Sequence, residues 1–282
     1  LLKLVGDVPS SQTADVLDQL WEDLCVSPAS ETVAYRKGRR WVASHERLPL
    51  KPSDPTQQFR HKGTYLLTGG LGDLSLVVAR ELATQFSARL VLLGRTELPE
   101  RSQWTSYRRM HSGTDKVSRA IAAIEELEVL GAEVIYRVAD VRNVEQMTAA
   151  VEAAKNRFGS LNGVLHTAGI VRDNLIQLKS FDEIEDVLSP KVYGTSVLAR
   201  VLEKEDIDFL VLFSSTSTDT APVGQVDYVA ANAYLNAYAE SRSGEQKRQT
   251  VAVHWGVWNE VGIAARASLN PGSASATSKE LI

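Results

Sequence analysis

The stretch that decides the fold is Gly63-Thr64-Tyr65-Leu66-Leu67-Thr68-Gly69-Gly70-Leu71-Gly72-Asp73-Leu74-Ser75. It begins as an apolar run typical of a buried parallel strand and continues into a glycine-rich turn that opens a helix. Glycines at such a turn permit a tight bend and let backbone N–H groups approach a pyrophosphate at the positive helix end. Ser75 replaces the third glycine of the usual pattern, and we expect it to crowd the helix–strand packing slightly.

Downstream of this turn, apolar and β-branched runs alternate with helical segments. The six predicted strands are Tyr65–Thr68, Leu90–Leu93, Val134–Val138, Val164–Thr167, Phe209–Ser214 and Val251–Trp255. Strands separated by helices predict an α/β fold, a Rossmann-like doubly wound parallel sheet with helices on both faces, because right-handed crossovers leave few other solutions. We therefore expect ligands to bind beyond the carboxyl ends of the strands.

Two stretches depart from this alternation. Leu98–Asp115 is interpreted as an inserted surface segment, and Ser268–Ser278, rich in Ser, Ala and Gly, is expected to be mobile.

The chain upstream of Gly63 has a different pattern. Apolar residues at helical spacing predict a helix over Thr13–Cys25, followed by two short strands at Thr32–Tyr35 and Arg40–Ala43. Pro49, Pro52 and Pro55 mark a linker, because proline continues neither a helix nor a ladder. We predict a structural fragment at 1–50, a linker at 51–62, a catalytic unit at 63–267 and a mobile segment at 268–282.

Composition limits the class of protein. In 282 residues, 44% are hydrophobic and 23% charged, and no apolar run approaches the roughly 20 residues that a membrane helix needs. A net charge of -4 argues against a nucleic-acid partner. The lone Cys25 excludes an internal disulfide and suits a cytoplasmic location. The first residues lack a signal-peptide pattern and resemble an interior cut from a longer chain. We expect no membrane partner and no metal site.

Further candidate nucleotide contacts follow the later strands. Arg95, at the end of the second strand, suits the 2′-phosphate of NADP, although a solvated arginine is the plainer interpretation. Asp140-Val141 follows the third strand toward the adenine, and Thr167-Ala168-Gly169 follows the fourth toward the nicotinamide ribose. With the glycine turn, the candidate set is Thr68, Gly69, Gly70, Leu71, Gly72, Asp73, Leu74, Arg95, Asp140, Val141, Thr167, Ala168 and Gly169.

The candidate catalytic residues lie in the second half of the sheet. Tyr228 and Asn232 are four residues apart, so a helix places both on one face. Ser215 follows the fifth strand, where its hydroxyl could hold a carbonyl oxygen while Tyr228 donates a proton. Lys191 is the candidate cation that lowers the tyrosine pKa, and Ser189-Pro190-Lys191 predicts a helix start. Taken singly, Lys191 also fits a surface lysine and Tyr228 a core aromatic.

Together these residues resemble the short-chain dehydrogenase/reductase superfamily, and specifically the ketoreductase domains of modular polyketide synthases, over Gly63 to Ala267. Ordinary members carry the lysine four residues after the tyrosine, whereas this chain has Asn232 there and Lys191 upstream, as polyketide ketoreductases do. The spacings of Lys191, Ser215 and Tyr228 also match that family. Residues 33–43 resemble the end of its cofactor-free structural subdomain, which would pack against the catalytic sheet.

The resemblance implies a reaction. NADPH would reduce a β-ketoacyl thioester carried on the phosphopantetheine of an acyl carrier protein, beside neighbouring synthase domains. Val171-Arg172-Asp173 stands where B-type members, which yield a D-configured hydroxyl, carry Leu-Asp-Asp, and Thr220 replaces the A-type tryptophan. We therefore expect a B-type enzyme, although Asp173 also fits a simple turn cap. Trp255-Gly256-Val257-Trp258 is expected in the substrate wall.

Two alternatives stay open. A free-standing reductase of a small ketone would have no use for residues 1–50 unless they pack on the sheet. A catalytically silent NADP-binding module would have no use for Tyr228, Ser215 and Lys191 together.

Overall fold

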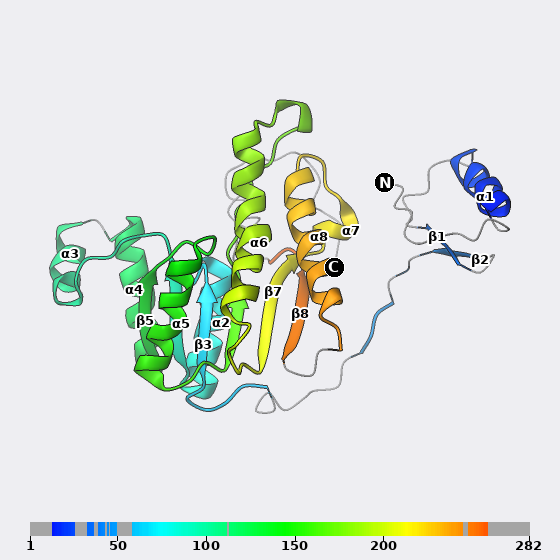
Figure 1. The fold of residues 1–282 in the computed structure, drawn as a ribbon. Helices are drawn as coiled ribbons and strands as arrows, with labels where there is room; N and C mark the ends of the chain where they lie inside the picture. Colours follow the sequence, from blue (N-terminus) through cyan, green and yellow to red (C-terminus); the bar gives the residue numbers. More distant parts are fainter. Residues whose placement is uncertain are drawn as a thin grey trace. The chain divides into compact units, whose positions relative to one another are not determined.

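A computed structural model describes residues 13–25, 33–36, 39–42, 44, 46–49, 58–111, 113–244 and 248–258 (Figure 1). The chain divides into two compact units, Leu1–Ser53 and Asp54–Ile282. The predicted mobile segment at 268–282 and the end of the predicted catalytic unit lie outside the described residues. None of the described helices is long and apolar enough to span a membrane.

The first unit contains one helix and one hairpin. Helix α1 (Thr13–Cys25) has the predicted bounds, and strands β1 (Val33–Arg36) and β2 (Arg39–Val42) pair in antiparallel fashion within one residue of their predicted positions. Asp23 of α1 accepts hydrogen bonds from the Tyr35 hydroxyl and, at 2.9 Å, from Nε of Arg40. This carboxylate therefore ties the helix to the hairpin.

The second unit is built on a six-stranded parallel sheet in the order β5-β4-β3-β6-β7-β8. Its strands are β3 (Thr64–Thr68), β4 (Arg89–Gly94), β5 (Glu133–Val138), β6 (Gly163–His166), β7 (Phe209–Ser215) and β8 (Gln249–Trp255). The predicted doubly wound fold is confirmed. The strand order reverses between β3 and β6, which is where such sheets bind ligands.

Helices cover both faces of the sheet (Figure 1). They are α2 (Asp73–Phe86), α3 (Trp104–Met110), α4 (Lys116–Val129), α5 (Val144–Phe158), α6 (Phe181–Val201), α7 (Ser217–Thr220) and α8 (Val226–Ser241), with short 3-10 turns η3 (Arg101–Gln103) and η4 (Ile176–Leu178). Strand side chains alternate between two cores. Leu66 and Val91 pack with α5, α6 and α8, whereas Leu67 and Leu92 pack with α2 and α4.

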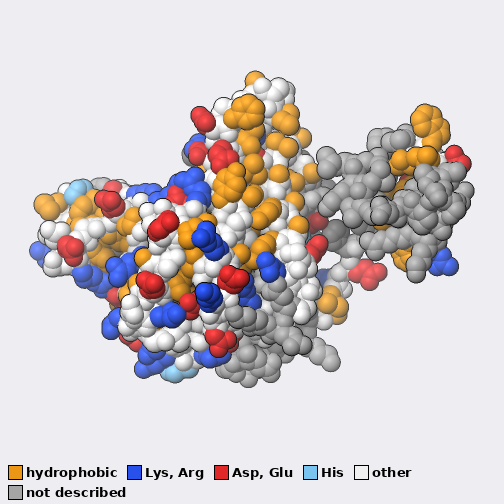
Figure 2. Space-filling view, viewed as in Figure 1, with side chains coloured by type: hydrophobic (Ala, Val, Ile, Leu, Met, Phe, Trp, Pro, Cys, Tyr) orange, Lys and Arg blue, Asp and Glu red, His pale blue; other side chains and the backbone are white. Residues whose placement is uncertain are grey.

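Figure 2 shows apolar side chains gathered over α6 and α8. The exposed large apolar residues of these two helices are Phe181, Tyr193 and Val226. Phe181 and Val226 lie at the helix starts, close in sequence to Ser180 and Asp227. The amino-terminal ends of α6 and α8 therefore expose apolar side chains.

The predicted helix start at Ser189 is wrong. Helix α6 begins after Ser180, whose side chain and that of Glu183 form a reciprocal capping box, and Pro190 lies inside the helix. Pro190 costs the helix one backbone hydrogen bond, but the strong upstream cap and the packing of a buried face outweigh that loss. Ser189 is buried and its Oγ accepts a hydrogen bond from Arg142 instead of capping a helix. Lys191 thus projects from the middle of a helix.

The segment 98–115, predicted as an inserted surface segment, contains η3 and α3 and packs on α4. Trp104 is buried in the core that contains Ile121, and its Nε1 donates to the Pro99 carbonyl at 2.9 Å. Arg101 lies 4.1 Å over the Trp104 ring. Trp104 therefore anchors this surface segment in the core beneath α4.

The last residues of the predicted linker pack on the second unit. Phe59 contacts the rings of Tyr65, Phe86 and Phe209 at centroid distances of 5.4 to 5.6 Å, and Lys62 N donates to the Phe86 carbonyl. Residues 51–57 lie outside the described residues.

Candidate active site

The four candidate catalytic side chains come from three elements that converge at the carboxyl edge of the sheet. Ser215 is the last residue of β7, Tyr228 and Asn232 lie on α8, and Lys191 lies on α6. Ser215 and Asn232 lie close enough to the Tyr228 phenol that both lower its pKa. Lys191 Nζ lies 6.0 Å from the centre of the Tyr228 ring. The structure therefore brings all four together.

The pKa of Tyr228 is raised above its ordinary value, whereas the sequence predicted that Lys191 would lower it. Burial of the phenol is the main cause, since it penalises the phenolate, and the Asp173 carboxylate raises the pKa further. Polar interactions with Asn232 and Ser215 lower the pKa, but by less than burial raises it. Tyr228 is consequently held in its protonated form, as a proton donor requires.

Lys191 is almost fully buried, with 4% of its surface exposed. Burial lowers its pKa to about 8, because desolvation penalises the ammonium. Its Nζ donates to the Phe213 carbonyl of β7 at 2.7 Å. A β-carbon at Gly169 would lie 2.9 Å from the Lys191 Cε, so this glycine leaves the space that the lysine occupies.

Asn232 is fully buried. Its Nδ2 donates to the Tyr228 carbonyl at 2.8 Å, one helical turn earlier. Its Oδ1 has no hydrogen-bond partner among the described residues. A buried acceptor without a partner is costly in a structural role and suits a proton relay.

The glycine turn has the geometry that a dinucleotide needs. Gly69 has a φ of +64°, and a β-carbon there would lie 3.0 Å from the Ala168 Cα, so no other residue fits without strain. Gly72 caps α2 without any side-chain hydrogen bond. Backbone amides of the first turn of α2 are therefore left uncovered by a capping side chain, as a pyrophosphate site requires.

Ser75 is 1% exposed within this helix, and its Oγ has no partner among the described residues. The third-glycine position therefore holds a buried hydroxyl that gains no hydrogen bond there.

Side chains at the ends of β3 and β6 fasten these strands to each other at the topological switch point. Thr68 Oγ1 lies 2.7 Å from His166 Nδ1 and accepts from Ala168 N at 3.3 Å, and Thr167 Oγ1 donates to the Thr68 carbonyl. His166 is fully buried, and burial together with the Lys191 charge lowers its pKa to about 3. Sequence reasoning missed His166, although its place directly before Thr167-Ala168-Gly169 pointed to it.

Arg95 and Asp140 lie near each other at the ends of β4 and β5. Arg95 is exposed and forms no ion pair among the described residues, and its charge contributes to a lowered pKa of Asp140. The larger cause is Arg142, which sequence reasoning also missed and whose Nη2 lies 2.6 Å from Asp140 Oδ2. Val141 is buried and packs against Gly194 of α6. Two arginines thus flank the carboxylate expected near the adenine.

The two residues expected at the substrate come from different parts of the chain, the loop before η4 and the end of β8. Asp173 is exposed, and its carboxylate accepts a hydrogen bond from Gln225 Nε2 at 3.0 Å. Trp255 ends β8, with its ring 5.4 Å from that of Phe213 and 5.0 Å from that of Trp258. A wall of aromatic rings therefore stands at the carboxyl end of the edge strand.

Comparisons with known proteins agree with this geometry. The KR domain family matches residues 63–260. The chain is 33% identical over 87% of its length to polyketide synthase PksM of Bacillus subtilis, and 34% identical over 88% to a phenolphthiocerol/phthiocerol polyketide synthase subunit of Mycobacterium tuberculosis. It covers 5% and 13% of those proteins, respectively.

Solved structures show the same relationship. A ketoreductase domain from the bacillaene assembly line is 31% identical, with a TM-score of 0.72 over 89% of this chain and 56% of that chain. A structure described as an A-type ketoreductase from a modular polyketide synthase is 28% identical, with a TM-score of 0.67 over 85% of this chain and 47% of that chain.

Proposed function

The chain belongs to the KR domain family, the ketoreductases of polyketide synthases, and from that premise we propose that it reduces a β-ketoacyl thioester to the β-hydroxyacyl thioester with NADPH. The observation that carries the proposal is the convergence of Tyr228, Ser215, Asn232 and Lys191 from β7, α8 and α6. A silent NADP-binding module would gain nothing from burying Lys191 beside Tyr228.

In the proposed mechanism the hydroxyls of Ser215 and Tyr228 hold the ketone oxygen. When bound, NADPH supplies the hydride that the β-carbon receives. Tyr228 gives its proton to the oxygen as negative charge develops there, and its raised pKa keeps it protonated until that moment. Lys191 and the buried Oδ1 of Asn232 maintain the relay that returns a proton to Tyr228.

The preference for NADPH rests on the ends of β3, β4 and β5. We assign the 2′-phosphate to Arg95, which is exposed and unpaired among the described residues. The pyrophosphate is assigned to the turn Thr68 to Leu74, the adenine side to Asp140 and Val141, and the nicotinamide ribose to Thr167, Ala168 and Gly169. Positive charge at Arg95 favours a phosphate there over a bare ribose hydroxyl.

We further propose B-type stereochemistry, with a D-configured product. Asp173 is the family's matching aspartate, and its hydrogen bond with Gln225 fixes it beside the helix that carries Tyr228. Thr220 stands where A-type members carry a tryptophan. In this proposal the aromatic side chains around Trp255 form a further part of the substrate wall.

The proposed partners are an acyl carrier protein, which delivers the substrate on phosphopantetheine, and neighbouring synthase domains. Support comes from the relatives, which are polyketide synthases many times longer than this chain. Their aligned portions cover most of residues 1–282.

The test is reduction of a β-ketoacyl N-acetylcysteamine thioester. The rate is measured from the loss of NADPH absorbance, and the configuration of the product is determined by chiral analysis. The proposal expects consumption of NADPH, slower consumption of NADH and an excess of the D-hydroxy product. Tight NADPH binding without turnover, with both this thioester and a carrier-bound substrate, would favour the silent module.

A further inference from the structure

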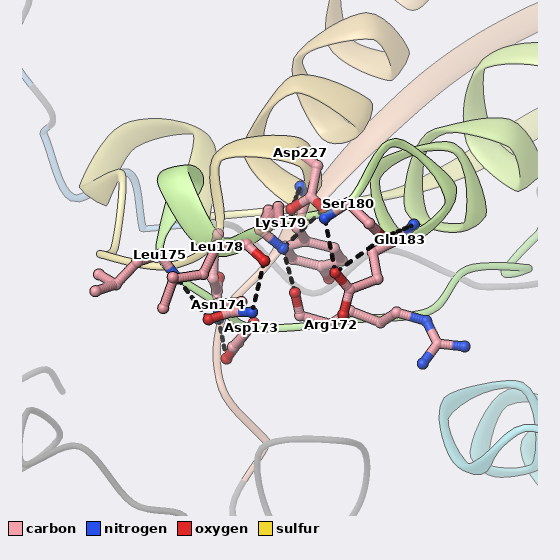
Figure 3. A network of polar contacts seen from close by, with 11 residues as sticks. Arg172, Asp173, Asn174, Leu175, Leu178, Lys179, Ser180, Glu183 and Asp227 are labelled. Atoms are coloured by element: carbon pink, nitrogen blue, oxygen red, sulfur yellow. Dashed lines mark hydrogen bonds and ion pairs between the residues drawn. The ribbon is translucent and has the colours of Figure 1, made fainter.

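A buried ion pair lies directly beside the candidate site and outside the four catalytic residues. Lys179 Nζ contacts Asp227 Oδ2 at 2.9 Å, and the two side chains are 0% and 1% exposed (Figure 3). Lys179 stands in the segment that leads into α6, whereas Asp227 is in the first turn of α8, next to Tyr228. The pair therefore joins two segments that are 48 residues apart in sequence.

Each partner has a second contact that extends the connection. Lys179 Nζ also donates to the carbonyl of Arg172, within the tripeptide Val171-Arg172-Asp173 (Figure 3). The Asp227 Oδ1 accepts from the backbone N–H of Tyr228 at 2.9 Å. One chain of polar contacts thus runs from the proposed stereocontrol tripeptide to the backbone of the proposed proton donor.

Two further hydrogen bonds connect the same segments. Asn174 N donates to the Gly224 carbonyl at 3.0 Å, and Gln225 Nε2 donates to Asp173 at 3.0 Å. Gly224 has a φ of +89°, a conformation that favours glycine and lets its carbonyl meet Asn174. The tripeptide and the start of α8 consequently form one cross-linked unit.

A purely stabilising role explains this pair poorly. Desolvation of two charges offsets most of their attraction, so a buried ion pair contributes little more to stability than packed apolar residues of similar size. The segments that carry the pair are otherwise open to solvent, because the side chains of Ile176, Leu178 and Val223 are 64%, 63% and 85% exposed. The pair therefore resembles a device that fixes geometry at a functional site.

We propose that Lys179 and Asp227 are positioning residues for the reduction. They hold the tripeptide at Arg172 and Tyr228 in a fixed relation, so that the ketone presents one face to the hydride while its oxygen meets the phenol. This inference rests on the proposed function. It assigns neither residue a contact with substrate or cofactor.

The test compares Lys179→Met with the double variant Lys179→Met/Asp227→Asn. The double variant leaves no unpaired buried charge, and its new amide side chain would retain an oxygen to accept from the Tyr228 N–H. Lys155→Met is the matched control, because Lys155 on α5 contacts Glu205, in the loop after α6, at 3.0 Å in a more exposed pair. Each variant is measured for NADPH affinity, thermal unfolding, kcat, KM and the ratio of D to L product.

The proposal expects both Lys179 variants to bind NADPH within about twofold of the parent, with kcat lowered roughly tenfold or more and the D to L ratio eroded by a similar factor. The double variant should recover thermal stability without recovering the ratio. Lys155→Met should change none of these quantities. An unchanged product ratio in a double variant that binds NADPH overturns the positioning role, whereas absence of reductase activity in the parent overturns the proposed function itself.

Discussion

Replacing Lys191 by methionine is predicted to stabilise the protein while abolishing reduction. The lysine pKa falls from 10.5 to about 8 on burial, which corresponds to about 3 kcal/mol of unfavourable free energy for the charged form. The methionine variant removes that cost but leaves the Phe213 carbonyl without its donor, a loss of about 1 kcal/mol. We therefore expect a net gain of about 2 kcal/mol in the free energy of unfolding at pH 7.

The stability difference between Lys191→Met and the parent should depend on pH, whereas a difference caused by packing alone would not. Between pH 8 and 10.5 the unfolded lysine binds a proton that the native one has released, so the stability of the parent rises with pH by about 1.4 kcal/mol per unit. The advantage of Lys191→Met must shrink accordingly over that interval. Urea unfolding at pH 7, 8.5 and 10 measures it.

The reasoning is refuted if Lys191→Met is no more stable than the parent at pH 7, or if the difference between them is the same at pH 10. The expected result would indicate that Lys191 is retained for function at a cost to stability.

Three further predictions concern the nucleotide side of the sheet. Arg95→Ala should raise the KM for NADPH about tenfold and leave that for NADH nearly unchanged, in parallel steady-state assays; equal effects on both cofactors would refute the assigned 2′-phosphate contact. Ser75→Ala should raise the free energy of unfolding by about 1 kcal/mol, because it removes a buried hydroxyl without a partner; a loss in urea unfolding would indicate a missed hydrogen bond. Because His166 stays neutral down to about pH 3 when folded, stability should fall as pH drops below 6.5, by about 2 kcal/mol at pH 5, and His166→Gln should lack that slope. An unchanged slope in the variant would contradict the buried neutral imidazole.

The sheet was predictable because buried parallel strands have continuous apolar runs in the sequence. Each predicted strand lies within two residues of its observed bounds, and the glycine turn fixed where β3 meets α2. Helical spacing predicted that Tyr228 and Asn232 share one face, and the end of a strand predicted the position of Ser215, whereas Lys191 was joined to them through the resemblance to polyketide ketoreductases.

The sequence did not show which of two competing local signals would prevail. It also did not show contacts between residues that are far apart along the chain. Pro190 suggested a helix start, but the Ser180–Glu183 cap had already opened the helix. Whether the pKa of Tyr228 is raised or lowered depends on how deeply the phenol is buried, and no sequence motif indicates that depth. Lys179 sits in a polar stretch, and its partner Asp227 becomes evident only when α6 and α8 are packed.

The most direct test of the central claim is single-turnover reduction of a β-ketoacyl thioester by the parent and by Tyr228→Phe, each preloaded with NADPH. The account predicts equal NADPH affinity and a rate lowered by about 100-fold or more in the variant, because only the proton donor is lost. Equal single-turnover rates would contradict the assignment of Tyr228 as the proton donor, and with it the mechanism built around Ser215, Asn232 and Lys191.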